Sequence, residues 1–172
     1  MDKIKFKKLL FDIACSTMAC DYDIDDREIQ ELKNISESTN YFKGVDLSKR
    51  LENFKSKFNE NAEETINDFT RKLEGSFLNP VQEMLLLEIV LRIVYADTKI
   101  DPHEVEFVNK VRSFLSISDE LIKDRFGVID FLINKQIDIA ETKEKQKESL
   151  SSTDMENLEN LYYGIADKKE KN

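Results

Sequence analysis

A chain of 172 residues, of which 40% are hydrophobic and 35% charged, is long enough to bury a core and too apolar to be disordered. Its four glycines and two prolines are too few for the many tight turns of an all-β protein, and its net charge of −9 disfavours binding to a nucleic acid backbone. No apolar run reaches the roughly 18 residues that span a bilayer, so we expect a cytoplasmic all-α protein.

The two cysteines, Cys15 and Cys20, lie close together in a helical pattern. Their spacing places them on different faces of one helix, whereas a disulfide needs close Cα atoms. The sequence therefore predicts two free, buried thiols in a reducing compartment.

Apolar residues recur at helical spacing, which predicts a compact bundle of about seven to eight helices. The first helix is expected over residues 3–20. Each later helix is expected to start at a residue whose side chain can accept a hydrogen bond from the first-turn amides. These residues are Asp25, Asp46, Asn61, Asn79, Asp101 and Ser118. Pro80 and Pro102 follow two of these caps at the first helical position, and Gly75 is expected to end the helix that Asn61 starts.

The segment from Pro80 to Tyr95 is the most apolar in the chain and predicts a central, buried helix. After Met84, only Glu88 and Arg92 interrupt its apolar residues. These two lie four residues apart on one stripe of the helix, where they can pair.

The chain divides into two predicted parts. Residues 1–140 are expected to form the helical domain, and Phe131 to Ile139 extend its apolar pattern beyond Gly127. Residues 141–172 are expected to form a polar linker followed by a short amphipathic helix, which can dock on the domain or bind a partner.

The motif D-x-x-I-D-x-x-E occurs twice, at Asp21–Glu28 and at Asp97–Glu104. Residues 10–35 align with residues 86–111, and apolar positions coincide along both copies. Such repetition predicts two pseudo-repeated hairpins, each a helix, an acidic loop and a second helix, packed about a pseudo-twofold axis.

A buried helix that ends in A-D-x-x-I-D-x-x-E, twice in one domain, resembles the TerB-like family, named after the tellurite resistance protein TerB. The copies read C-D-Y-D-I-D-D-R-E from Cys20 and A-D-T-K-I-D-P-H-E from Ala96, and the resemblance covers about residues 5–140. It implies a compact all-helical fold, an acidic metal site, and an association with bacterial stress-response and tellurite-resistance systems. Family loops commonly have glycine after the first aspartate, where this chain has Tyr22 and Thr98.

Six residues match the acidic motif of the family, and together they form the predicted metal-ligand set. They are Asp21, Asp25, Glu28, Asp97, Asp101 and Glu104. The second aspartate and the glutamate of each copy can equally form a capping box, in which the N-cap is worth about 1 kcal/mol. Asp21 and Asp97 instead follow a helix C-terminus, where the helix dipole disfavours a carboxylate. Either loop amides in an Asx-turn or a hard divalent cation, Ca²⁺ or Mg²⁺, would compensate for that charge.

Two other classes of site are excluded by the pattern. An EF-hand loop would need glycine where Asp26 stands and a bidentate glutamate where Leu32 stands. His103, the single histidine, is expected to be exposed near a helix N-terminus, and no nucleophile–base set or Gly-rich phosphate loop can be argued from spacing. We therefore expect no enzymatic activity.

The favoured hypothesis is a non-enzymatic TerB-like stress-response or defence module whose two acidic loops bind a divalent cation or a basic partner. The alternative is a metal-free helical scaffold, a protein-interaction subunit of a larger complex. Both imply another protein as partner, and neither involves nucleic acid or a membrane span.

Overall fold

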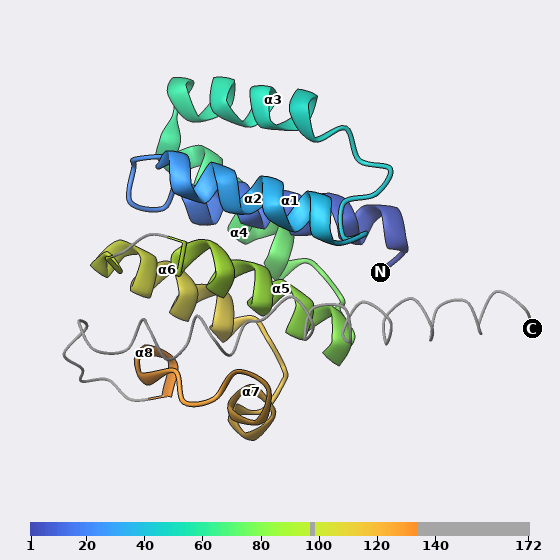
Figure 1. Cartoon of the computed structure of the whole chain (residues 1–172), viewed down its shortest axis with the longest axis vertical. Coiled ribbons are helices and arrows are strands. Elements are labelled where there is room, and N and C mark those ends of the chain that lie inside the picture. Colours follow the sequence, from blue (N-terminus) through green and yellow to red (C-terminus); the bar gives the residue numbers. More distant parts are fainter. Residues whose placement is uncertain (97–98, 134–172) are drawn as a thin grey trace, which may run out of the picture.

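The computed structural model describes residues 1–96 and 99–133 of the chain (Figure 1). Within these ranges it contains eight helices and no strand, which confirms the all-α prediction. The helices are α1 (Lys3–Met18), α2 (Asp26–Ser38), α3 (Leu47–Glu60), α4 (Ala62–Glu74), α5 (Pro80–Val94), α6 (Pro102–Ser113), α7 (Asp119–Phe126) and α8 (Asp130–Ile133). The predicted linker and C-terminal helix, residues 141–172, lie outside the described residues, as do residues 134–140 of the predicted domain.

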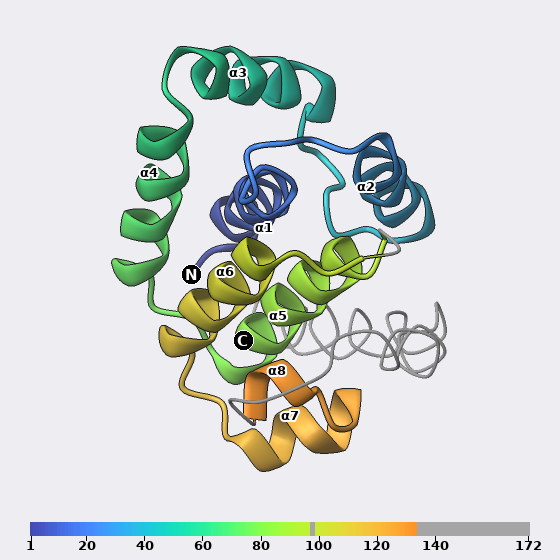
Figure 2. The same ribbon diagram turned by 90° about the vertical axis from the view of Figure 1, so that its left-hand side faces the viewer.

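The core is built around α5, as its apolar sequence predicts. Twelve of its 15 residues are buried, and α1 packs along it with 11 of its 16 residues buried. Seen end-on in Figure 2, α1 lies between α2 and α4, with α5 and α6 beneath it and α3 at the periphery. Cys15 and Cys20 are both buried and free, which confirms the prediction of two unpaired thiols.

Each predicted N-cap is confirmed. The side chains of Asp25, Asp46, Asn61, Asn79, Asp101 and Ser118 all accept a hydrogen bond from a first-turn amide of the helix that follows. Helices α2, α5 and α6 have complete capping boxes, and Gly75 caps the end of α4. Because a cap involves residues only two or three apart, these helix boundaries follow from local sequence.

The two polar residues in the middle of α5 bind other helices. Arg125 of α7 donates a hydrogen bond to the Glu88 carboxylate at 2.8 Å, although Glu88 is 0% exposed. Arg92 donates to Glu31 of α2 at 2.6 Å. The polar stripe of α5 therefore attaches α2 and α7 to the core through charge pairs in a largely dry environment.

A second buried carboxylate positions the loop before α7. One oxygen of Glu83 accepts hydrogen bonds from the amides of Ser116 and Ile117 at 2.8 and 2.9 Å. Glu83 lies in the first turn of α5 and is buried. Together with the Arg125–Glu88 pair, it fixes α7 at two points along α5.

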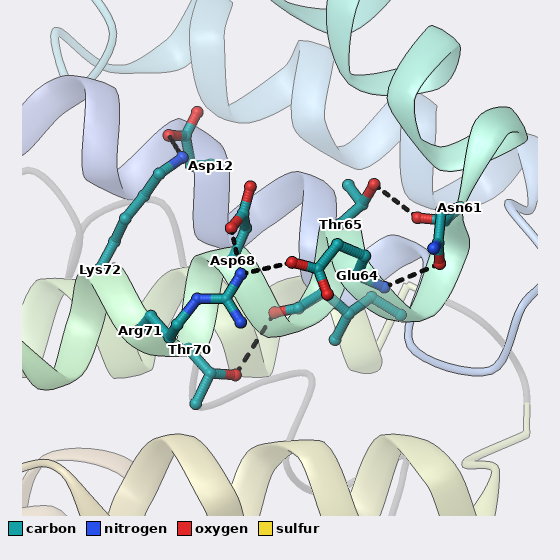
Figure 3. A network of polar contacts seen from close by, with 9 residues as sticks. Asp12, Asn61, Glu64, Thr65, Asp68, Thr70, Arg71 and Lys72 are labelled. Atoms are coloured by element: carbon teal, nitrogen blue, oxygen red, sulfur yellow. Dashed lines mark hydrogen bonds and ion pairs between the residues drawn. The ribbon is translucent and has the colours of Figure 1, made fainter.

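A polar contact joins α4 to α1 (Figure 3), and a second one joins α3 to the same residue of α1. Lys72 of α4 lies 3.3 Å from the Asp12 carboxylate of α1, and Arg50 of α3 pairs with the same carboxylate. On the exposed side of α4, Arg71 pairs with Glu64 at 2.7 Å. No residue of α3 is buried, and the Arg50–Asp12 pair contributes to holding this helix in place together with the partly buried Leu51 and Phe54.

The two ends of the bundle carry different segments. The loops that follow α1 and α5 lie at one end, and the start of α1 lies at the other with the loops of residues 39–46 and 75–79 (Figure 1). None of the described helices is both long and apolar enough to cross a membrane.

Candidate functional site

The first acidic loop begins directly after α1 with an Asx-turn. The Asp21 carboxylate accepts a hydrogen bond from the backbone amide of Asp23 at 3.0 Å. The sequence allowed either a loop amide or a divalent cation to compensate for the charge of Asp21, and the loop amide is present. The second oxygen of Asp21 is not used in this turn.

Tyr22 adopts a backbone conformation that is unfavourable for a residue with a Cβ. Its φ is +69°, the only positive φ outside glycine among the described residues. Left-handed backbone places Cβ too close to the following carbonyl oxygen, which is why glycine is favoured there. This position follows Asp21, where the family resemblance led us to expect glycine.

We expect Tyr22→Gly to be more stable than Tyr22→Ala by about 1 kcal/mol, because both remove the ring and only glycine relieves the left-handed backbone. Urea unfolding of the two variants measures the difference directly. The same pair at Glu37, an exposed position in α2, should show the ordinary order, with alanine the more stable. Equal free energies of unfolding for Tyr22→Gly and Tyr22→Ala would contradict backbone strain at this position.

Asp25 and Glu28 form the first capping box. Asp25 accepts hydrogen bonds from the Arg27 amide at 2.7 Å and from its guanidinium Nε at 2.9 Å. Glu28 accepts a hydrogen bond from the Asp25 amide at 3.1 Å. The hydrogen bonds from Arg27 lower the pKa of Asp25 to about 2, so this carboxylate is ionised at neutral pH.

Asp101 and Glu104 form the second box in the same way. Asp101 accepts a hydrogen bond from the His103 amide at 2.8 Å, and the His103 ring nitrogen Nδ1 lies 2.7 Å from the same oxygen. These contacts with His103 lower the pKa of Asp101, and His103 itself is exposed, as predicted. Glu104 accepts a hydrogen bond from the Asp101 amide at 2.6 Å. Asp97, the first aspartate of this copy, lies outside the described residues.

The structure brings the two acidic loops together. Burial raises the pKa of Glu28 to about 8, with a smaller contribution from the negative charges of Glu104 and Asp21 and against the opposing hydrogen bond from the Asp25 amide. Burial also raises the pKa of the Cys20 thiol, with the charge of Glu104 as the next contribution. These buried glutamates, one from each box, are therefore electrostatic neighbours although 76 positions separate them.

A ring contact joins the same two segments at the surface. The rings of Tyr22 and His103 meet edge to face, with their centroids 6.4 Å apart. Beside this contact, residues from the loop after α1, from α4 and from α6 line a cavity of about 280 Å³, with Cys20, His103 and Lys110 on its wall. The two motifs do not predict this cavity, because α4 contributes to it from outside both of them.

The oxygen-rich donor set suits a hard cation such as Ca²⁺ or Mg²⁺ by its chemistry. In its described part, the chain has no group of three or more His, Cys, Asp or Glu side chains arranged to hold a metal ion. Each described carboxylate of the six-residue set accepts a hydrogen bond from a backbone amide nearby. The metal site that the sequence suggested, which includes Asp97, stays a prediction.

The fold and the site together define a class of protein. It is a small all-helical bundle with two acidic loops at one end, and each loop leads into a helix that begins with a capping box. The family model of tellurite resistance protein TerB matches residues 10–125, which include both loops, and the chain belongs to this family. Comparisons with curated proteins and with solved structures gave no match.

Proposed function

We propose that this chain is a non-enzymatic module of a bacterial tellurite-resistance or stress-response system, and that its paired acidic loops form one binding surface. The surface would take a divalent cation or a basic region of a partner protein. The observation that supports this proposal is the convergence of the two loops, which places Glu28 beside Glu104 and Tyr22 against His103.

The electrostatics of the buried glutamates favour a positively charged ligand. Glu28 is 5% exposed and Glu104 is 4% exposed, so water would screen poorly the repulsion that arises when both are ionised. A cation or a basic side chain brought near them would offset this repulsion and favour their ionised forms. Asp21 lies close enough to affect both Glu28 and Cys20, and it can contribute an oxygen that the Asx-turn does not use.

Asp21→Asn is the sharpest test of this surface. Asparagine retains the oxygen that accepts the Asp23 amide, so the substitution removes the charge and preserves the turn. Asp46→Asn is the matched control, because Asp46 caps α3 through an equivalent hydrogen bond from the Lys49 amide at 3.1 Å, at the other end of the bundle. Asp97→Asn tests the corresponding position of the second motif.

Calorimetric titration with Ca²⁺ and Mg²⁺ separates the two ligands. A cation site would be supported by a heat of binding that is lost in Asp21→Asn and in Asp97→Asn. The control Asp46→Asn should retain this heat. Without such heat, a partner co-purified from the native host that is lost with Asp21→Asn would support a basic protein surface. If neither measurement responds to Asp21→Asn, the metal-free scaffold replaces this proposal.

A further inference from the structure

The end of the bundle opposite the acidic loops exposes three apolar side chains close together. Phe77 is 92% exposed, Ile4 is 48% exposed and Met1 is 42% exposed. The backbone nitrogen of Met1 lies 3.4 Å from the carbonyl oxygen of Phe77, and Ile4 follows within the first turn of α1. We call these three residues the apolar tip.

Lysines surround the apolar tip. Lys3, Lys5 and Lys8 belong to the first turns of α1, and Lys43 lies beside them because its carbonyl oxygen accepts a hydrogen bond from Lys7 at 2.9 Å. Lys5, Lys8 and Lys43 are exposed. We call Lys3, Lys5, Lys8 and Lys43 the basic rim.

The charge balance of this end differs from that of the whole chain. Residues 1–11, 39–46 and 74–79 contain five lysines and only three acidic residues, whereas the chain carries a net charge of −9. The acidic residues are Asp2, Asp46 and Glu74. Asp2 and Asp46 each accept a hydrogen bond from a helix amide, and Asp2 also lies 3.6 Å from Lys5. The lysines therefore dominate the charge around the apolar tip.

We propose that the apolar tip and the basic rim dock this protein on an anionic membrane surface. Exposed aromatic and aliphatic side chains insert at the boundary between headgroups and acyl chains, while lysines around them approach the anionic headgroups. The contact that we propose is peripheral, because it uses only side chains at the surface of the bundle.

Charge complementarity identifies this occupant and fixes its orientation. A protein with net charge −9 is repelled by an anionic membrane unless a basic region faces it. Docking through the basic rim turns the acidic loops, at the opposite end of the bundle, away from the lipid (Figure 1). The loops would then remain accessible, so this inference does not depend on what they bind.

Vesicle co-sedimentation of the full chain tests the proposal. The probes are vesicles of phosphatidylcholine alone and of phosphatidylcholine mixed in equal amounts with phosphatidylglycerol. Binding is expected only to the mixed vesicles and should weaken as salt is added, because salt screens the attraction between lysines and headgroups. The double variant Lys5→Glu/Lys8→Glu should weaken binding by at least about 25-fold, since one lysine near an anionic surface contributes roughly fivefold.

Phe77→Ser should weaken binding about tenfold without altering the fold, because the ring is almost fully exposed. Lys33→Glu/Lys55→Glu is the matched control, since it changes net charge equally at exposed positions in the middle of α2 and α3. The proposal would be supported if the control binds the mixed vesicles as the wild type does, while Lys5→Glu/Lys8→Glu and Phe77→Ser lose binding.

Three results would overturn it. They are equal binding to the two kinds of vesicle, binding that Lys5→Glu/Lys8→Glu leaves unchanged, and a dimer, formed without vesicle binding, that Phe77→Ser abolishes. The last result would identify this end as a contact between copies of the chain.

Discussion

Arg125→Ala is expected to lower the free energy of unfolding by about 3 kcal/mol, because it removes the cation that faces a fully buried carboxylate. The Arg125 guanidinium lies 2.8 Å from Glu88, which is 0% exposed, and it also lies over the ring of Phe126. Without the arginine, Glu88 loses a charge-assisted hydrogen bond while it remains buried, and the buried charge is then less well compensated. Urea unfolding followed by circular dichroism measures the loss.

Two further variants separate the charge pair from general damage to α7. Glu88→Leu/Arg125→Leu should recover most of the stability, because replacing both members of a buried pair by apolar side chains is often neutral or stabilising. Arg71→Ala, which breaks exposed pairs with Glu64 and Asp68, should cost much less stability, because water screens exposed ion pairs. Equal losses for Arg71→Ala and Arg125→Ala would contradict the role assigned to burial.

Glu28→Gln is expected to stabilise the protein above pH 8 and to remove part of its pH dependence. The pKa of Glu28 is about 8 in the folded chain, against an ordinary value of 4.5. Between these values the folded state keeps a proton that the unfolded state releases. The contribution of Glu28 to stability is therefore complete below pH 4.5 and is lost as the pH rises through 8.

Glutamine at this position preserves the capping box. In α5 the equivalent residue is Gln82, whose side-chain oxygen accepts a hydrogen bond from the Asn79 amide at 3.1 Å. The Glu28→Gln variant should thus keep the local structure and lack the buried charge. We expect it to exceed the wild type by about 2 kcal/mol at the alkaline side of the window.

Unfolding by urea at several pH values across that window provides the measurement. Glu64→Gln is the matched control, because Glu64 occupies the same position in the first turn of α4 but is exposed. Its pH profile should follow that of the wild type.

The low pKa of Asp25 affects stability only at acidic pH, where stability is lost as the pH falls towards 2. Parallel profiles for Glu28→Gln and the wild type would contradict the raised pKa.

The same measurement bears on the acidic loops as a binding surface. A cation held near Glu28 and Glu104 would lower the pKa of Glu28. Saturating Ca²⁺ or Mg²⁺ should then stabilise the wild type most at high pH, where Glu28 is ionised, and should stabilise Glu28→Gln less.

Local sequence determined where most helices of this protein begin. Asp25, Asn79 and Asp101 each cap a helix through hydrogen bonds to residues two or three positions away, so a short stretch of chain contains the whole interaction. The apolar composition of Pro80 to Tyr95 likewise predicted a central helix without knowledge of its neighbours. The sequence did not decide whether a loop amide or a cation compensates for the negative charge of Asp21. The structure shows the amide of Asp23.

Only the tertiary structure decided which distant side chains meet. Glu88 binds Arg125 of α7 and Arg92 binds Glu31 of α2, and the spacing of residues within α5 cannot identify these partners on other helices. The approach of Glu28 to Glu104 has the same origin, because it depends on how α1 and α5 pack and turn both loops towards one end of the bundle. Capping is a property of a few consecutive residues, whereas burial and electrostatic proximity arise only when separate helices assemble. The lowered pKa values of Asp25 and Asp101 therefore arise from residues two positions away in the sequence, whereas the raised pKa of Glu28 arises from burial and from the distant Glu104, which only the fold provides.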